Sequence, residues 1–562
     1  MSSNPVSSLC GDIKDIKIDH KEKSGNYEGK LPNAIEGEVV TRFPPEPSGY
    51  LHIGHAKAAL LNFYYSQRYK GKMLLRFDDT NPALENEEFQ NSIMEDLKVL
   101  NVSFYSLSFT SDYFDEIMNY CKEMIKMGKA YADNTPVEVM REERGKGIEN
   151  QNRNNTVEEN LKLWDEMISG SEDGLKCCIR AKIDMSCKNK CMRDPVIYRC
   201  ILLPHHRTGT KYKVYPTYDF ACPIVDSIEG VTHALRTNEY SDRIEQYQWV
   251  IKALDLRPVN IYEFSRLNFV HTILSKRKLS WIVNSGLVDG WDDPRFPTVR
   301  GILRRGLTPQ ALLKFVIEQG PSKNSNLMEW DKLWTINKQI IDPIIPRFFC
   351  VGQDAVVVNF SNGPELPVIN ERDLHQKNKD IGKGPITMYK SILIDRDDAS
   401  LFTDNEEITL MKWSNAIVTN LNNLNSSLGK IDGKLNLQGD FRSTKKKIHW
   451  LANLPTNLVK CILREFDHLI IKKKPEDGDN IEDLVNRNSM FETHAYCDPL
   501  VKNLKLGDKL QFERRGYFII DKPFDVNKPD KAIILIKIPD GRSKLSSNIS
   551  TKVDSQKLTK GA

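Results

Sequence analysis

The stretch from Arg42 to Lys57, which reads RFPPEPSGYLHIGHAK, constrains the fold of this chain more than any other part of its sequence. The residues just before it, GEVVTR (37–42), have the pattern of a short buried strand, and the prolines and Gly49 that follow predict a rigid turn. Beyond the turn the chain reads AKAALLNFYYSQRYKG, a run of helix-forming residues with an apolar stripe that ends at Gly71. The predicted order is strand, turn, His-x-Gly-His, helix.

This order predicts an anion site. The free N–H groups and the positive dipole end of a helix would lie beside the imidazoles of His52 and His55, and a nucleoside triphosphate is the expected ligand. Gly54 has no side chain, so a flat adenine could lie directly on the backbone. The dinucleotide fingerprint GxGxxG is absent, which indicates a Rossmann-type sheet with a different phosphate-binding device. A lone His-x-Gly-His is weak evidence, because it also arises by accident in loops.

The motif does not stand alone. With its flank, PPEPSGYLHIGHAKAA resembles the HIGH signature of class I aminoacyl-tRNA synthetases, in particular the glutamyl and glutaminyl subgroup. Further on, LRFDDTNP (75–82) is similar to the subgroup's second active-site segment, and LSKRK (274–278) resembles its KMSKS loop. Ile273 and Leu274 replace the first lysine and the methionine of that pattern, departures that the subgroup tolerates, and Lys276 occupies the second-lysine position. The resemblance runs from about residue 35 to about residue 545.

Length and charge limit the function classes. A chain of 562 residues is too long for a single core, so three to five domains are expected. The net charge is only +4, from 80 basic and 76 acidic residues, so an RNA partner would bind to local basic faces rather than through bulk charge. No apolar run approaches the ~20 residues that span a bilayer, and the first 26 residues lack the apolar core of a secretory signal. We therefore expect a cytoplasmic protein without a membrane partner.

The cysteines favour reduced thiols over a zinc site. Eleven are scattered along the chain, and the one local cluster contains no C-x2-C pair. That cluster comprises Cys177, Cys178, Cys187, Cys191 and Cys200. Free thiols are the better interpretation, so no structural zinc is expected.

Composition changes twice along the chain. From about Asp112 to Thr210, charged helical stretches lead into short strands, and the patch NQNRNN (150–155) is predicted to be a solvated loop. Beyond Phe349, short β-rich segments alternate with turn residues about every ten residues, a spacing typical of β-barrels. Lysine runs such as STKKKIHWL could contact RNA, or could simply protect strand edges from association.

The expected fold class is a multidomain α/β protein. It would have a Rossmann-type parallel-sheet catalytic domain split by an acceptor-stem-binding insertion, then a helical subdomain and two β-barrels; the resemblance supplies the RNA-binding roles. The expected parts are an N-terminal tail (1–35), the first half of the catalytic domain (36–111), the insertion (112–214), the second half (215–268), the KMSKS-like loop with the helical subdomain (269–348), the anticodon-binding barrels (349–550) and a C-terminal tail (551–562).

Asp78 is the first candidate for amino-acid binding. It follows the strand-like residues 73–77, and the carboxyl ends of strands are where open α/β sheets bind ligands. From the residues alone, the favoured alternative is an Asx turn made with Asp79 and Asn81 that caps a helix predicted over Glu85 to Leu100. The resemblance implies that Asp78 contacts the substrate ammonium.

A second group of candidates follows the insertion, where we predict a buried strand over Phe220 to Val225. The planar guanidinium of Arg236 could bind a carboxylate in a two-pronged manner, and the hydroxyl of Tyr218 could donate to the same anion. The alternative for Arg236 is a surface ion pair with Glu239 or Asp242, which would contribute little.

The resemblance implies a ligase of the archaeal and eukaryotic glutamyl type, which activates L-glutamate with Mg²⁺-bound ATP and transfers it to the terminal ribose of tRNA(Glu). His52 and His55 would contact the triphosphate and Lys276 would neutralise its developing charge; Arg42 would join Tyr218 and Arg236 at the substrate carboxylates. No metal-ligating side chain is expected. The remaining nucleotide-site positions are Glu46, Pro47, Ser48, Gly54, Thr237, Arg266, Leu267, Leu274 and Ser275.

Three alternatives stay open at this point. A glutaminyl-tRNA synthetase shares the expected architecture. A non-catalytic, synthetase-like RNA-binding protein is disfavoured because the motif positions keep competent chemistry. A HIGH-type nucleotidyltransferase is disfavoured by the insertion and by the β-rich carboxyl half.

Overall fold

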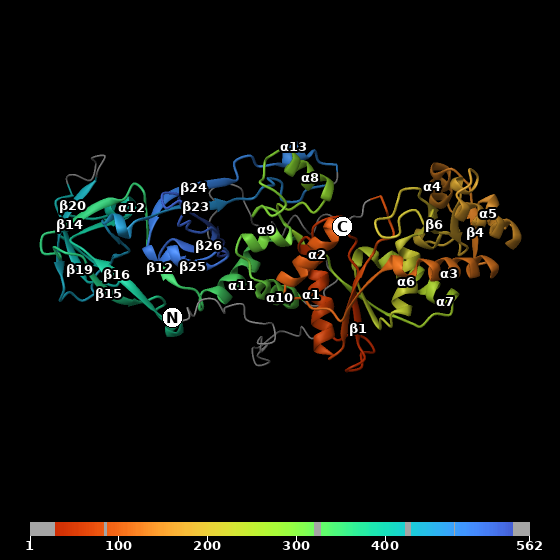
Figure 1. Ribbon diagram of the computed structural model, residues 1–562, viewed down its shortest axis with the longest axis horizontal. Coiled ribbons are helices and arrows are strands. Elements are labelled where there is room, and N and C mark those ends of the chain that lie inside the picture. The colour runs from red at the N-terminus through yellow and green to blue at the C-terminus, as the bar shows by residue number, and fades with distance from the viewer. Residues whose placement is uncertain (1–28, 84–86, 320–326, 422–428, 477, 543–562) are drawn as a thin grey trace. The chain divides into compact units, whose positions relative to one another are not determined.

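The computed structural model of this protein describes residues 29–83, 87–319, 327–421, 429–476 and 478–542. The chain forms two compact units, one of residues 1–268 with 316–326 and the other of residues 269–315 with 327–562 (Figure 1). No helix in the described part of the chain is both long and apolar enough to cross a membrane.

Parallel strands form the centre of the first unit. β1 (Val40–Phe43), β2 (Lys72–Phe77) and β3 (Ser106–Phe109) make one parallel sheet, and β8 (His233–Thr237) and β9 (Asn260–Phe264) make a second parallel pair. Thr232 joins the two: its N–H donates to the Val40 carbonyl at 2.9 Å, and its hydroxyl accepts from the Val40 N–H at 2.8 Å. The predicted Rossmann-type sheet is confirmed.

Helices pack on these strands at the places where the chain crosses over. They are α1 (Ile53–Arg68), α2 (Glu87–Val99), α6 (Tyr218–Ile228) and α7 (Ile244–Ala253). The buried strand predicted over Phe220 to Val225 is wrong, because these residues lie inside α6. Every residue from 220 to 227 is buried, so the segment has no polar face from which a helical period could be recognised, and Pro223 argued against a helix.

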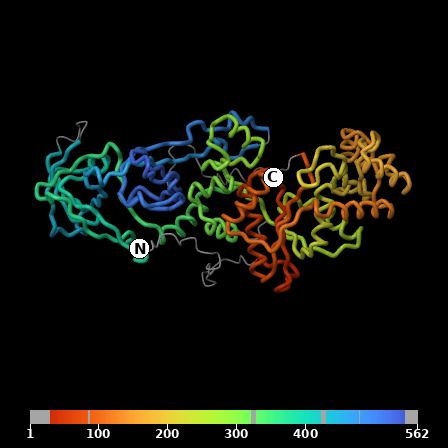
Figure 2. Tube along the Cα trace, viewed as in Figure 1, coloured from red at the N-terminus to blue at the C-terminus, as the bar shows by residue number. Residues whose placement is uncertain are grey.

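The insertion is an antiparallel sheet with its own helices, drawn in orange to yellow in Figure 2. Its strands, in the order β4-β5-β6-β7, are β4 (Ala130–Asp133), β5 (Cys178–Ala181), β6 (Val196–Cys200) and β7 (Val214–Pro216). Its helices are α3 (Phe114–Lys126), α4 (Val137–Lys146) and α5 (Val157–Ser169). A core around Trp164 and Tyr198 continues into Phe220 of α6, which fastens the insertion to the catalytic domain.

The solvated loop predicted for residues 150–155 is wrong. Residues Gln151–Asn154 form a 3-10 helix, and Asn150 is buried with its amide donating to the Asp133 carboxylate at 3.3 Å. Arg153 donates to Asp194 at 2.8 Å. A polar composition cannot reveal such partners, because they lie elsewhere in the sequence.

The second unit begins with helices, as predicted: α8 (Lys276–Asn284), α9 (Val299–Arg304), α10 (Pro309–Glu318), whose last residues fall in the first unit, and α11 (Asp331–Ile341). Two short strands, β10 (Asn268–Phe269) and β11 (Leu327–Met328), pair beside them.

Two seven-stranded sheets make up the rest of the second unit. The first runs β21 (Lys447–Ile448), β18 (Glu406–Leu410), β19 (Asn415–Thr419), β20 (Lys430–Asn436), β14 (Val356–Phe360), β17 (Ser391–Ile394), β22 (Leu451–Ala452). The second runs β12 (Arg347–Phe348), β25 (Lys509–Phe512), β26 (Gly516–Lys522), β27 (Ile533–Ile538), β23 (Val459–Phe466), β24 (Met490–Cys497), β13 (Cys350–Gly352). The hairpin β15 (Val368–Asp373) and β16 (Lys383–Met388) and the short helices α12 (Arg396–Ser400) and α13 (Ile481–Leu484) complete the unit.

Both sheets curl toward closure. The two edge strands of the first sheet, β21 and β22, follow one another directly in the chain, as do the edge strands of the second sheet, β12 and β13. The opposite edges of each sheet must therefore lie close together, so each sheet bends back on itself. Each encloses its own apolar core, one around Val358 and Trp450 and the other around Leu463 and Leu535. The predicted pair of β-barrels is confirmed as two closed-in, half-barrel sheets.

Candidate active site

His52 and His55 lie at the first turn of α1, where each side chain caps the backbone of the other residue. The Nδ1 atom of His52 accepts from the N–H groups of Gly54 (3.1 Å) and His55 (3.4 Å), and Nδ1 of His55 accepts from the His52 N–H at 3.3 Å. The rings stack with their centres 3.7 Å apart. Because both Nδ1 atoms accept, each neutral ring has its proton on Nε2, ready to donate to an anion.

The environment of both imidazoles favours their neutral form, although the His55 side chain is exposed and His52 is only half-buried. Desolvation by the surrounding protein, followed by the charge of Arg266, lowers the pKa of His55 to about 4, and desolvation also lowers the pKa of His52 well below its ordinary value. They can therefore act on a phosphate as hydrogen-bond donors but do not supply positive charge.

Gly54 is needed for this arrangement. A Cβ at this position would lie 2.9 Å from Cε1 and 3.1 Å from Nδ1 of the His52 ring, so any side chain would push that imidazole away from the cap. This contact explains the glycine within the protein itself, and the expectation that adenine lies on it stays a prediction.

Asp78 and Asp79 have different roles at the end of β2. Asp79 is fully buried and its carboxylate accepts from the N–H (2.8 Å) and the hydroxyl (2.5 Å) of Ser111. Asp78 is only partly buried, and Thr80 donates to it at 3.1 Å. Burial and the negative charge of Asp79 raise the pKa of Asp78 to about 7. Asp79 is thus structural, whereas Asp78 has the environment of a ligand-binding group.

Arg236 lies at the end of β8 inside an aromatic cage. Its guanidinium carbon is 4.8 Å from the ring centre of Tyr240, 5.5 Å from that of Tyr247 and 5.7 Å from that of Tyr218. Only 5% of the residue is exposed, and Nη2 has no hydrogen-bond partner among the described residues. Its closest carboxylate oxygen, on Asp219, is 3.8 Å away.

The surface ion pair considered for Arg236 is therefore wrong. Glu239 pairs instead with Arg266, at 2.6 Å, and Arg236 is buried. Burial raises the pKa of Tyr218 well above its ordinary value, so its hydroxyl stays protonated and able to donate. A buried cation without a full partner, next to a hydroxyl donor, is suited to a carboxylate ligand.

Arg42 lies deeper than Arg236 and is fully enclosed. Its Nε donates to both oxygens of Asp226, at 3.0 and 3.1 Å, and its Nη1 donates to the Leu235 carbonyl at 3.0 Å. Asp226 also accepts from Arg76, which binds Glu229 at 2.7 Å. Two buried guanidinium groups are thus balanced by two carboxylates.

The other nucleotide-site candidates of the first unit gather around the ends of β8, β9 and β1. Thr237 is the last residue of β8, Leu267 is fully buried just after β9, and Arg266 contacts Glu239. In the turn after β1, the exposed Glu46 accepts from the Ser48 N–H at 2.8 Å through its carbonyl, and Pro47 is buried. Their contacts with a nucleotide stay a prediction.

Lys276 belongs to the second unit. It is the exposed first residue of α8, after Ser275 and the half-buried Leu274, so the basic run is the start of a helix rather than the loop predicted from the sequence. The core beneath α8 is completed by Leu469, Ile470, Leu484 and Val485, from the segment that connects β23 with β24.

The same connection also holds the residues before α8. His271 donates its N–H to the Lys473 carbonyl at 2.9 Å and contacts the Ile470 carbonyl through Nδ1 at 2.9 Å, while its ring stacks on His468. The segment that presents Lys276 therefore packs on the connection between two strands of the second sheet, β23 and β24.

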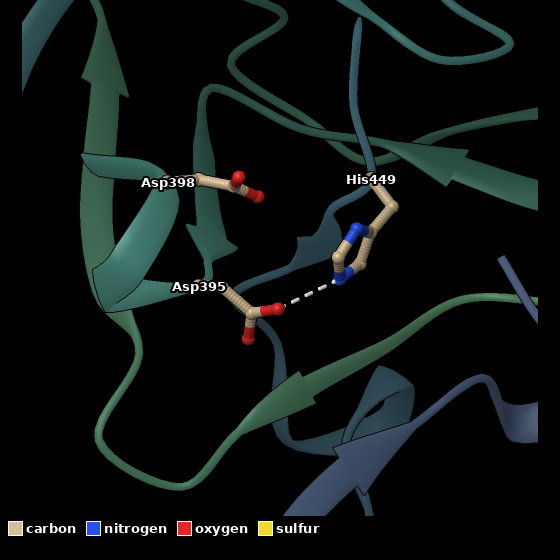
Figure 3. Close-up of side chains that lie close together, drawn as sticks. All are labelled: Asp395, Asp398 and His449. Atoms are coloured by element: carbon tan, nitrogen blue, oxygen red, sulfur yellow. Dashed lines mark ion pairs between the residues drawn. The ribbon is translucent and has the colours of Figure 1, made fainter. Parts of the chain in front are cut away.

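One group of described residues has the spacing of a metal site: Asp395, Asp398 and His449, shown in Figure 3. Its carboxylates are already engaged. Arg514 binds Asp398 through both oxygens, at 2.5 and 2.6 Å, and Arg515 binds Asp395 at 2.5 Å. These contacts join the two half-barrel sheets and leave no ligand set for a cation. The five insertion cysteines form no such group within the described ranges.

Two residues that lie beside Arg236 were not among the candidates predicted from the sequence. The ring of Tyr240 lies against the Arg236 guanidinium. Burial raises the pKa of Tyr240, and the negative charge of Asp78 contributes to the rise. An isolated tyrosine is part of no motif, so the sequence did not indicate it. Asp219 lies near Arg236 and is bound by Arg243, but in the sequence it only precedes the buried strand predicted over Phe220 to Val225, so no motif marked it. Asp78, Arg236, Tyr218 and Tyr240 are brought together; Arg42 lies behind them.

A parallel-sheet domain with two imidazoles at a helix start, split by an insertion and followed by two closed-in sheets, has the organisation of a class I aminoacyl-tRNA synthetase. The catalytic-domain model of "tRNA synthetases class I (E and Q)" matches residues 38–343, and two anticodon-binding-domain models of the same family match residues 345–436 and 447–521. The chain belongs to this family, in which catalysis uses ATP.

Three similar proteins are curated as glutamate–tRNA ligases. The probable cytoplasmic enzyme of Schizosaccharomyces pombe is 52% identical over 553 residues, which cover 96% of this chain and 76% of that protein. The cytoplasmic enzyme of Arabidopsis thaliana is 53% identical, with 94% and 73% covered, and that of Saccharomyces cerevisiae is 52% identical, with 92% and 72% covered.

Proposed function

We propose that this chain is a cytoplasmic glutamate–tRNA ligase, which activates L-glutamate with Mg²⁺-bound ATP and transfers the glutamyl group to the terminal ribose 2′-hydroxyl of tRNA(Glu). The observation that carries the choice of amino acid is Arg236, a buried guanidinium whose Nη2 lacks a hydrogen-bond partner within the described residues. Glutamate differs from glutamine by one negative charge, and this group is placed to detect that charge. The curated names of the similar proteins support the same substrate.

In the first step, an oxygen of the glutamate α-carboxylate attacks the α-phosphorus of ATP, and pyrophosphate leaves. Asp78 binds the ammonium, while Arg236 and Tyr218 hold carboxylate oxygens and Arg42 supplies positive potential from behind. His52 and His55 donate Nε2–H to phosphate oxygens. Lys276 neutralises the charge that develops on the leaving pyrophosphate. The nucleotide is further lined by Glu46, Pro47, Ser48, Gly54, Thr237, Arg266, Leu267, Leu274 and Ser275.

In the second step, the ribose hydroxyl attacks the activated carbonyl, and AMP leaves. No covalent nucleophile of the protein is needed, because both steps depend on positioning and on stabilisation of charge. In this proposal the insertion (112–214) binds the acceptor stem, and the two half-barrel sheets (349–550) bind the anticodon.

The test is ATP–pyrophosphate exchange and tRNA charging, each with glutamate and with glutamine, in the presence and absence of tRNA. Charging with glutamate and not glutamine supports the proposal. Preferential charging with glutamine would identify the glutaminyl branch, and RNA binding without either reaction would identify a non-catalytic member.

A further inference from the structure

The connection between β6 and β7 of the insertion reaches the backbone of the amino-acid site. Within it, His205 and Gly209 pair through both of their backbone hydrogen bonds, at 2.9 and 2.8 Å. His205 is buried, and its ring packs edge-on against Phe114 and face-on against Tyr215. The position of this ring is therefore fixed by the insertion.

The hydrogen bonds of His205 define the direction in which its ring donates. Nδ1 accepts from the N–H groups of Arg207 and Thr208, both at 3.2 Å, so the ring proton is on Nε2. Nε2 lies 2.8 Å from the backbone carbonyl oxygen of Asp79 and donates to it. Nδ1 thus closes the local turn, and Nε2 binds the backbone of Asp79, the residue that follows Asp78.

Arg207, from the same turn as His205, also helps to hold Asp79 in place. Its guanidinium lies 3.7 Å from the ring centre of Phe109, and Nη1 donates to the Ser111 hydroxyl at 2.6 Å and to Asp112 at 2.8 Å. Ser111 in turn donates to both carboxylate oxygens of Asp79. The insertion thus fixes Asp79 through its main chain and, by way of Ser111, through its side chain.

We propose that His205 is a positioning residue for Asp78, so that recognition of the amino-acid ammonium depends on the turn at residues 205–209 of the insertion. The inference rests on the proposed function. Asp78 can direct its carboxylate only as well as its backbone is held, and that backbone is anchored by the Asp78 N–H on the Pro45 carbonyl and by the Asp79 carbonyl on His205. Without the hydrogen bond from His205, the Asp78 carboxylate would be held less precisely and would bind the ammonium more weakly, while the contacts of Arg236 with the carboxylates would be unchanged.

Two substitutions separate the two halves of the ring. In His205→Asn, the side-chain oxygen can replace Nδ1 as the acceptor for the turn, but nothing reaches the Asp79 carbonyl. In His205→Gln, the longer amide can place an N–H near the position of Nε2 and restore that bond. We expect His205→Asn to raise the KM for glutamate about tenfold, the usual worth of one lost hydrogen bond, and His205→Gln to recover most of the loss. The KM for ATP should change less than about twofold in both.

The decisive readout compares glutamate with glutarate, which has both carboxylates and lacks the ammonium. Inhibition constants for glutarate, measured in ATP–pyrophosphate exchange with saturating tRNA, should be the same for the parent and for His205→Asn. A purely structural collapse would weaken glutamate and glutarate together, and that result would overturn the proposal. So would a parental KM for glutamate in His205→Asn.

His375 provides a matched control. It is buried in the second unit with the same pattern: Nδ1 accepts from the N–H groups of Lys377 (3.2 Å) and Asn378 (2.9 Å), and Nε2 contacts the Asp342 carbonyl at 3.1 Å. His375→Asn should leave the KM for glutamate unchanged; an increase equal to that of His205→Asn would overturn the assignment. If the parent enzyme neither exchanges pyrophosphate nor charges tRNA with glutamate, the proposed function fails instead.

Discussion

Replacing Arg236 tests the proposal that its guanidinium distinguishes glutamate from glutamine. The two amino acids are nearly isosteric, so shape cannot separate them. Arg236→Cys removes the buried guanidinium and leaves a small, uncharged side chain. We expect kcat/KM for glutamate to fall strongly, with a much smaller loss, or a gain, for glutamine.

The expected loss of kcat/KM for glutamate can be estimated from the hydrogen bonds that the Arg236 guanidinium lacks when no ligand is bound. Its Nη2 has no hydrogen-bond partner in the described part of the chain, and the Asp219 oxygen at 3.8 Å is too distant for a hydrogen bond. A glutamate carboxylate can supply two charge-assisted bonds, each worth about 1.5–3 kcal/mol. Their loss, about 4 kcal/mol, corresponds to roughly a 10³-fold change in kcat/KM.

The assay is charging of purified tRNA with each amino acid by the parent, by Arg236→Cys and by Arg243→Cys. Arg243 is the control because it binds the same carboxylate, Asp219, and lies 5.3 Å from the same ring, Tyr240, but is 44% exposed. Its substitution should leave the glutamate-to-glutamine ratio within about threefold of the parent value. An unchanged ratio in Arg236→Cys, or equal changes in both variants, would refute the reasoning.

Three further outcomes are expected. Lys276→Ala should slow adenylate formation ~10²-fold or more with little change in glutamate affinity, since one transition-state charge contact is typically worth ~3 kcal/mol; single-turnover activation at the parental rate would contradict this. Gly54→Ala should weaken ATP binding in calorimetry, because its Cβ displaces the His52 ring, and parental affinity would show that the ring is not used. The folded-state pKa of Asp78, about 7, lies above the ordinary 3.8, so the fold loses stability as pH rises from about 4 through about 7. Asp78→Asn should therefore have a higher Tm than the parent at pH 8 and an equal Tm at pH 4, and an identical difference at both would argue against the shift.

The sequence was sufficient for features that depend on neighbouring residues. The strand, turn and helix around the His-x-Gly-His motif were predicted because proline, glycine and helix period all act over a few residues. The barrels were predicted from their short β-rich segments. The helix at residues 218–228 was missed because a segment buried on all sides shows no period, and the helical start at Lys276 was missed because a basic run resembles a solvated loop.

Long-range partners account for the rest. Asp79 was expected in a local turn, but it is bound by Ser111, and its carbonyl by His205 from the insertion. Asn150 was expected in solvent, but it is buried against Asp133. In each case the deciding contact joins residues that are far apart in the sequence and close only in the folded protein, so no local pattern could reveal it.

Among the charged groups at the ends of β1, β2 and β8, Arg236 and Asp78 have the least compensated buried charge, which supports their proposed contact with the substrate. Burying a charge is costly unless an opposite charge compensates for it. Arg42 and Arg76 are fully compensated by Asp226 and Glu229, and Asp79 is satisfied by Ser111. Arg236 retains an unpaired Nη2, and Asp78 has a carboxyl that burial has made reluctant to ionise. In the proposed complex the side-chain carboxylate of glutamate would supply the partner that Arg236 lacks, and its ammonium would supply a cation to Asp78, so glutamate binding should stabilise the site.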